Sequence, residues 1–129
     1  MSSITRANPT AAIIIIGDEI LSGRTKDKNI GWLAEQLNAQ GIQLREARVI
    51  ADVREVIIDT VRTMSAAVDL VFTSGGIGPT HDDITTESIA AAFGRKVIRH
   101  REAEARLLAH YQNTEIEFNA ARQKMADIP

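Results

Sequence analysis

The sequence predicts an α/β fold built on a mostly parallel sheet, and two observations lead to this prediction. Apolar, β-branched runs of strand length alternate along the chain with segments whose apolar residues recur at helical spacing. Strands that alternate with helices form parallel βαβ units with right-handed crossovers. The 129 residues are enough for one domain with a real core and hardly enough for two. We therefore expect a single α/β domain.

The first strand is predicted at residues 11–16, a continuously apolar run typical of a central strand that is covered on both faces. Residues 1–10 are polar and predict a flexible N-terminal tail, so the domain is expected to span residues 11–129. A helix is predicted at residues 29–40, where apolar residues recur at helical spacing and Gly41 can end the helix.

The next elements repeat this alternation. Residues 42–50 predict the second strand, and Asp52 is expected to cap a helix whose apolar stripe runs over residues 53–64. Residues 70–73 predict the third strand, and residues 86–93 predict the helix after it, with Thr85 or Thr86 as its cap.

The last third of the chain predicts three shorter elements. Residues 97–98 are expected to form a fourth strand of the same sheet. Apolar residues on one side predict helices at residues 101–112 and 117–126.

Two loops are expected to meet at one edge of the sheet. If the strand order is 2-1-3, the chain direction across the sheet reverses between strands one and three, and ligands bind at the carboxyl ends of the strands there. Residues 17–29 and 75–83 leave the sheet at that point. The second loop carries three glycines in four positions before a helix, a setting that suits a phosphate. Asp82 and Asp83 beside it suit a divalent cation on that phosphate.

Plainer roles remain open for the same residues. The glycines can serve only a tight turn, and Asp83 can simply add charge at a helix start, worth about 0.5–1 kcal/mol. Asp27 lies between Lys26 and Lys28, which can be its ion partners. Ser74 reads as a turn hydroxyl and not as a nucleophile, because it lacks the Gly-x-Ser-x-Gly setting.

Composition argues against several classes of partner and site. The net charge of −2 and the absence of a basic block disfavour a nucleic-acid or acidic-membrane surface. The absence of cysteine excludes disulfides and thiolate zinc sites. The run at 11–16 is too short to span a bilayer, and residues 1–10 lack the order of a signal peptide. We therefore expect a cytoplasmic domain that binds no nucleic acid and no membrane.

Three motifs resemble those of one family. They are Gly-Asp-Glu-Ile-Leu at 17–21, Asp27 with Asn29 two positions on, and Gly-Gly-Ile-Gly-Pro-Thr-His-Asp-Asp-Ile-Thr at 75–85. The chain resembles the molybdopterin-binding (MoaB/Mog) superfamily, most closely the N-terminal domain of competence/damage-inducible protein A (CinA). The resemblance covers nearly all of residues 11–129 and implies a three-layer α/β/α fold.

The resemblance also implies chemistry. Some superfamily members bind molybdopterin and adenylylate it or insert molybdate. The CinA-like branch is associated with metal-dependent cleavage of ADP-ribose-type pyrophosphates, and a related domain is fused to eukaryotic FAD synthase. Ile77 and the following Pro79-Thr80 differ from the cofactor-synthesis branch, which argues against molybdenum chemistry. Related domains continue past the position of Pro129, so we expect a C-terminally incomplete domain.

Carried onto this chain, the resemblance assigns roles to residues of both loops. Asp83, Asp82 and Asp18 are the expected catalytic residues, and Asp82 with Asp83 would hold the metal ion, expected to be Mg²⁺. Ligand contacts are expected from Gly17, Glu19, Asp27, Asn29, Ser74, Gly75, Gly76, Gly78, Thr80, His81 and Thr85.

Three functions stay open. The first is a domain that binds a pterin, such as molybdopterin, or a nucleotide phosphate. The second is a metal-dependent ADP-ribose or nucleotide pyrophosphatase, and the third is a non-catalytic interaction module. A homo-oligomer is expected, a dimer or a trimer, because related domains commonly associate and an uncovered sheet edge drives association.

Overall fold

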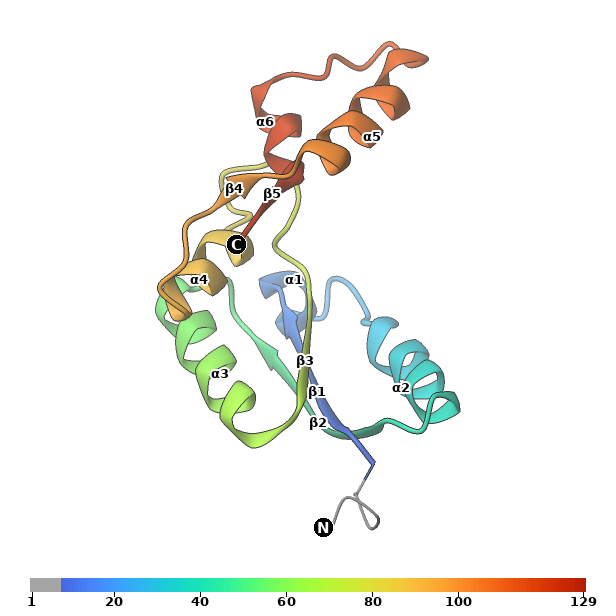
Figure 1. Cartoon of the computed structure of the whole chain (residues 1–129), viewed down its shortest axis with the longest axis vertical. Coiled ribbons are helices and arrows are strands. Elements are labelled where there is room, and N and C mark those ends of the chain that lie inside the picture. The colour runs from blue at the N-terminus through green and yellow to red at the C-terminus, as the bar shows by residue number, and fades with distance from the viewer. Residues whose placement is uncertain (1–7) are drawn as a thin grey trace.

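The computed structural model describes residues 8–129, and its centre is a three-stranded parallel sheet (Figure 1). The strands are β1 (Thr10–Ile16), β2 (Gln43–Ile50) and β3 (Leu70–Ser74). β1 lies in the middle and pairs in parallel with both neighbours, so the order is β2-β1-β3. The predicted α/β class and the order 2-1-3 are therefore confirmed. Most of the predicted tail, residues 1–7, lies outside the described residues, and Thr10 already belongs to β1.

Helices cover both faces of this sheet. α2 (Asn29–Ala39) lies on one side, and α3 (Arg54–Ala67) and α4 (Thr85–Ala92) pack together on the other (Figure 1). A single short helix, α1 (Asp18–Leu21), forms within the first predicted loop. These helix, sheet and helix layers match the three-layer α/β/α fold that the family resemblance implies. None of the helices between residues 8 and 129 is long and apolar enough to cross a membrane.

β1 contributes more buried residues than any other element in the described part of the chain. All of its residues from Ala11 to Ile16 are buried, which fits a central strand covered on both faces. Successive side chains of a strand point to opposite faces, so every second residue meets the same layer. The cluster on the α3 side consists of Ala12, Ile14, Ile16, Ile57, Val61, Met64 and Ala92. Burying one isoleucine side chain contributes roughly 1.5–3 kcal/mol. The buried strand β1 therefore fixes the position from which the first loop, residues 17–29, starts.

An arm follows α4 and projects away from the sheet (Figure 1). It contains β4 (Ile98–Arg99), α5 (Arg101–Gln112), α6 (Ala120–Gln123), the 3-10 turn η2 (Lys124–Ala126) and β5 (Asp127–Ile128). The prediction that residues 97–98 extend the main sheet is wrong, because β4 pairs antiparallel with β5 in a separate sheet. The single helix predicted at 117–126 is also wrong. The Asn119 side chain accepts the Arg122 N–H and starts α6 later in the chain.

Candidate ligand-binding site

A cleft of about 460 Å³ opens where β1 ends. β1 lies between β2 and β3, so its carboxyl end is the point at which the chain direction across the sheet reverses. Both predicted loops contribute to the cleft. Its lining consists of Ile16, Asp18, Glu19, Arg24, Asp52, Gly76, His81, Asp82, Asp83 and Ile84.

Asp18 and Asp52 hold the ends of β1 and β2 together at the mouth of this cleft. The Asp18 N–H donates to Oδ2 of Asp52 at 3.1 Å, and the Asp52 N–H donates to Oδ1 of Asp18 at 3.2 Å. The prediction that Asp52 caps α3 is wrong, because the position before that helix is Val53 and no side chain caps it. Asp52 is instead a cleft residue that the sequence did not assign to the site.

The glycine turn lies directly against the end of β1. Gly75 has a φ of +98°, and a Cβ added there would lie 2.0 Å from the Ile16 carbonyl oxygen. Gly76 has a φ of +71° and approaches the Thr85 hydroxyl in the same way. Glycine is therefore required at both positions by backbone conformation and by contact. Of the glycines in this turn, Gly76 lines the cleft.

Thr85 supports the turn and does not cap α4. Its hydroxyl donates to the Gly75 carbonyl oxygen at 2.8 Å, and its N–H donates to the Gly76 carbonyl oxygen at 3.0 Å. The side chain is buried, with 1% exposed. The predicted caps at Thr85 and Thr86 are wrong, because Ile84 precedes the helix and no side chain caps it.

Thr85→Val should destabilise the protein by about 1–2 kcal/mol, because the half-buried Gly75 carbonyl oxygen loses its donor while the side-chain shape is kept. Urea unfolding of the two proteins measures this loss. Thr63→Val is the control, because the Thr63 hydroxyl bonds the Asp59 carbonyl oxygen on the exposed side of α3. The control should change stability by less than about 0.5 kcal/mol. Equal losses would contradict the supporting role of Thr85.

Asp83 organises the turn that follows the glycines. Its Oδ2 accepts the Thr80 N–H at 2.9 Å and the Thr80 hydroxyl at 2.8 Å. Partial desolvation acts to raise the pKa of Asp83, but the hydrogen bonds from Thr80 and Gly78 and the charge of Lys124 together lower it below its ordinary value. Asp83 is therefore a carboxylate held in its charged form.

This lowered pKa links Asp83 to acid stability. A carboxylate with a depressed folded-state pKa contributes stability above its unfolded-state pKa and loses that contribution as the pH falls through the folded value. Asp83→Asn should therefore flatten the fall in unfolding free energy between neutral and strongly acidic pH, measured by urea unfolding at each pH. Thr80→Val removes one donor to the carboxylate and should give an intermediate curve. If Asp83→Asn lost unfolding free energy toward acidic pH as steeply as wild type, Asp83 would not be the source of this acid sensitivity.

Three residues predicted to contact the ligand, Asp27, Asn29 and Ser74, form hydrogen bonds within the protein. The Asp27 carboxylate accepts the N–H groups of Asn29 and Ile30 and so begins α2, and Asp27 does not line the cleft. The Asn29 side chain donates to the Ser74 hydroxyl at 2.5 Å, which ties the start of α2 to the end of β3. These residues position the two loops, and their predicted ligand contacts stay predictions.

The other predicted residues lie at or beside the cleft. Glu19 lines it, and the Glu19 carboxylate packs against Gly17, where an added Cβ would lie 2.6 Å from its Oε1. His81 and Asp82 line its outer part, with 3.0 Å between His81 Nε2 and Asp82 Oδ1. Arg24, which the sequence did not assign to the site, supplies the guanidinium group of the lining.

The acidic side chains of the cleft can hold a metal ion only if the bound ligand supplies the remaining coordinating atoms. Within residues 8–129, no three His, Asp or Glu side chains are placed to hold a metal ion by themselves. In phosphate sites Mg²⁺ commonly uses one or two carboxylates, and waters and phosphate oxygens supply the other ligands. Asp82, whose side chain is 80% exposed, and Asp83 suit that arrangement.

Comparison with known proteins identifies the family of the chain. The family model described as a probable molybdopterin binding domain matches residues 12–125. A CinA-like protein of Mycobacterium leprae is 38% identical over 128 residues, covering 92% of this chain and 30% of that protein. A probable FAD synthase of Caenorhabditis elegans is 49% identical over 84 residues, covering 65% of this chain and 16% of that protein. The chain spans about half of the length, or less, of the curated relatives that it matches.

A solved structure supports the same family. The crystal structure of CinA from Thermoplasma acidophilum has a TM-score of 0.82 and 34% sequence identity to this chain. The alignment covers 96% of this chain and 72% of that one. The chain therefore belongs to the MoaB/Mog superfamily of molybdopterin-binding domains and is of the CinA type.

Proposed function

We propose that the cleft binds a pterin or nucleotide through its phosphate groups, together with a divalent cation. The observation that carries this proposal is the charge of the lining. Five acidic residues line the cleft together with Arg24 and His81, and they are Asp18, Glu19, Asp52, Asp82 and Asp83. A phosphate alone would be repelled by such a surface, whereas a phosphate that carries a cation would not.

The shape of the site supports the same proposal. Its volume lies within the range of about 300–1,000 Å³ that is usual for small-molecule sites. The glycine turn leads toward the N-terminus of α4, and backbone N–H groups at such a place favour an anion. The relative named as a probable FAD synthase supports a nucleotide as the ligand, since FAD contains a pyrophosphate. The family description, a probable molybdopterin binding domain, supports a pterin as the ligand.

Calorimetric titration of the full chain with ADP-ribose tests the binding proposal. We expect binding in the presence of Mg²⁺ and loss of binding in EDTA, because the cation offsets the carboxylates. Mass spectrometry of the protein as purified would detect a retained pterin. A chain that binds neither ADP-ribose with Mg²⁺ nor a pterin would contradict the proposal and favour a non-catalytic module.

A second candidate function is pyrophosphate hydrolysis, favoured by the pairing of Asp18 with Asp52 in a cleft that Asp82 and Asp83 also line. In this reaction water forms a bond to one phosphorus, and the bond from that phosphorus to the bridging oxygen breaks. The bridging oxygen keeps the electron pair and leaves with the second phosphate. A carboxylate of the Asp18–Asp52 pair would take the proton of the water. A divalent cation held by Asp82 and Asp83 would neutralise charge on the leaving phosphate.

Phosphorus NMR of ADP-ribose incubated with the chain and Mg²⁺ tests hydrolysis separately from binding. Cleavage should convert the pyrophosphate signals into those of AMP and ribose 5-phosphate. Binding of ADP-ribose without these products would support a binding domain and contradict the hydrolase function.

Association of the chain with itself remains a prediction. Within the described residues β3 pairs only with β1, and two apolar side chains on this side of the protein are exposed, Leu70 at 40% and Phe93 at 49%. Sedimentation equilibrium should therefore show a dimer or trimer at high protein concentration. A monomer at every concentration would contradict it.

A further inference from the structure

The C-terminal arm reaches the cleft turn through one lysine. Lys124 lies in η2 and is half-buried, 41 residues after Asp83 in the chain. Its Nζ donates to the carbonyl oxygens of both Thr80 and Asp83, at 2.6 Å each. Hydrogen bonds from an ammonium group are shorter and stronger than those between neutral groups. Lys124 therefore holds both ends of the turn at residues 80–83.

These two carbonyl groups belong to the turn whose side chains line the cleft. The Asp83 N–H donates to the Thr80 carbonyl oxygen at 3.2 Å, so that oxygen receives both the turn hydrogen bond and the ammonium. A second hollow of about 160 Å³ faces the arm, and Lys124 lines it together with Asp83 and Glu87. The turn is thus held from the arm side while Asp82 and Asp83 line the cleft.

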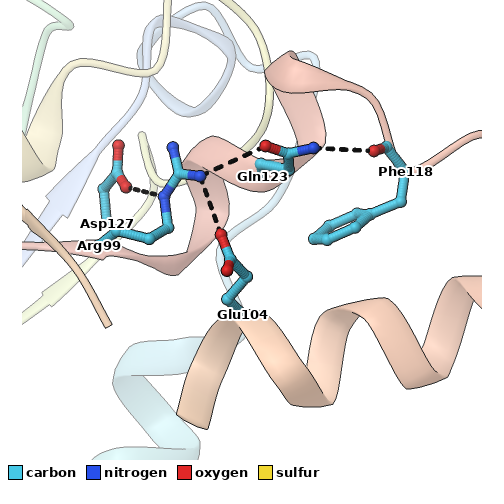
Figure 2. Close-up of polar contacts among 5 residues, drawn as sticks. All are labelled: Arg99, Glu104, Phe118, Gln123 and Asp127. Atoms are coloured by element: carbon cyan, nitrogen blue, oxygen red, sulfur yellow. Dashed lines mark hydrogen bonds and ion pairs between the residues drawn. The ribbon is translucent and has the colours of Figure 1, made fainter. Parts of the chain in front are cut away.

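The arm gives Lys124 an ordered support. Arg99 lies at its centre and donates to Asp127 at 2.5 Å, to Glu104 at 3.0 Å and to Gln123 at 3.4 Å (Figure 2). The Gln123 side chain in turn donates to the Phe118 carbonyl oxygen at 3.1 Å (Figure 2). Gln123 and Asp127 lie on either side of η2, so these contacts fix the short turn that carries the lysine.

We propose that Lys124 is a positioning residue of the cleft, which fixes the turn at 80–83 so that Asp82 and Asp83 meet the ligand. The arm is then a part of the site although it does not line the cleft itself. The effect on ligand affinity rests on the proposed function, whereas the effect on the turn does not. A lysine suits this role because its ammonium is a compact group with three donors, whereas the planar fork of arginine favours carboxylates and phosphates.

Amide hydrogen exchange of Lys124→Met tests the hold on the turn without any ligand. The amides of Thr80 and Asp83 should exchange about tenfold faster or more, because local opening sets their exchange rate. The amide of Ile14 in β1 should keep its rate, which separates loosening of the turn from general destabilisation. The matched control is Arg106→Met, which removes a charge from an exposed pair on the same arm, 2.9 Å from Glu102. The proposal is overturned if the turn exchanges as in wild type, or if Ile14 accelerates equally.

Titration with ADP-ribose and Mg²⁺ tests the consequence for the site. Lys124→Met should raise the Kd about tenfold or more, Lys124→Arg should recover part of the affinity, and Arg106→Met should match wild type. A loosened turn with unchanged affinity would overturn the positioning role. If the wild-type chain binds neither ADP-ribose nor a pterin, the proposed function fails independently of the role of Lys124. The exchange of Thr80 and Asp83 then decides whether Lys124 fixes the turn.

Discussion

Replacing Gly75 by alanine is expected to destabilise the protein by about 3 kcal/mol or more, and the variant is expected to accumulate poorly as folded protein. Gly75 has a φ of +98°, which an alanine adopts only under strain, and the new Cβ would lie 2.0 Å from the Ile16 carbonyl oxygen. That oxygen belongs to the backbone of the buried central strand, so it cannot move aside. Urea unfolding monitored by circular dichroism measures the loss.

Gly23→Ala separates the contact from the backbone conformation. Gly23 also has a positive φ, of +80°, but a Cβ added there meets nothing within 4 Å. This variant should lose only about 1 kcal/mol, the cost of the conformation alone. If both variants lost the same amount, close packing of the glycine turn on β1 would not be what requires glycine at position 75.

Asp83→Asn is expected to weaken the binding of ADP-ribose with Mg²⁺ about a hundredfold, the largest effect of any single side chain of the cleft. The substitution removes the charge that would meet the cation but keeps an oxygen that can accept the Thr80 donors. Stability should therefore fall by only about 1 kcal/mol at neutral pH. Calorimetry and urea unfolding of the same preparation measure the two effects separately.

Asp18→Asn supplies a second test at the same cleft. An asparagine at this position can still accept the Asp52 N–H through Oδ1, so the contact between β1 and β2 should survive. Its effect on affinity and that of Asp83→Asn should not add fully if both groups serve one cation. Asp59→Asn on the exposed side of α3 is the control and should bind as wild type. Wild-type affinity in both cleft variants would show that ligand binding does not involve this cleft.

The sequence predicted the central sheet well because the signals for its strands lie within each strand segment. The run at 11–16 is apolar at every position, so its burial on both faces follows without knowledge of its partners. Residues 70–72 are also apolar, whereas residues 42–50 are recognised from apolar residues that alternate in places. The strand order places both loops at one edge. The predicted strand at 97–98 is too short to identify its partner, and the observed strand, Ile98–Arg99, pairs with β5 instead of the main sheet.

The details of the site depend on contacts that no local pattern encodes. Asp52 precedes a helix and so reads as a cap, yet its carboxylate accepts an N–H from Asp18, 34 residues away in the chain. Asp27 carries a motif-like spacing but begins α2. Lys124 gave no signal at all, because its two acceptors are backbone oxygens in a distant turn.

The parallel pairing of β1 also determines when the cleft can form during folding. Its partners are distant in the chain: Thr10 pairs with Gln43, and Ala11 pairs with Leu70, 59 positions further on. Closing loops over such distances costs chain entropy before the pairing stabilises the sheet, so long-range parallel pairing slows folding. The glycine turn meets the end of β1 only after β3 has docked. A ligand that contacts both loops therefore stabilises only chains in which β1 and β3 are already paired.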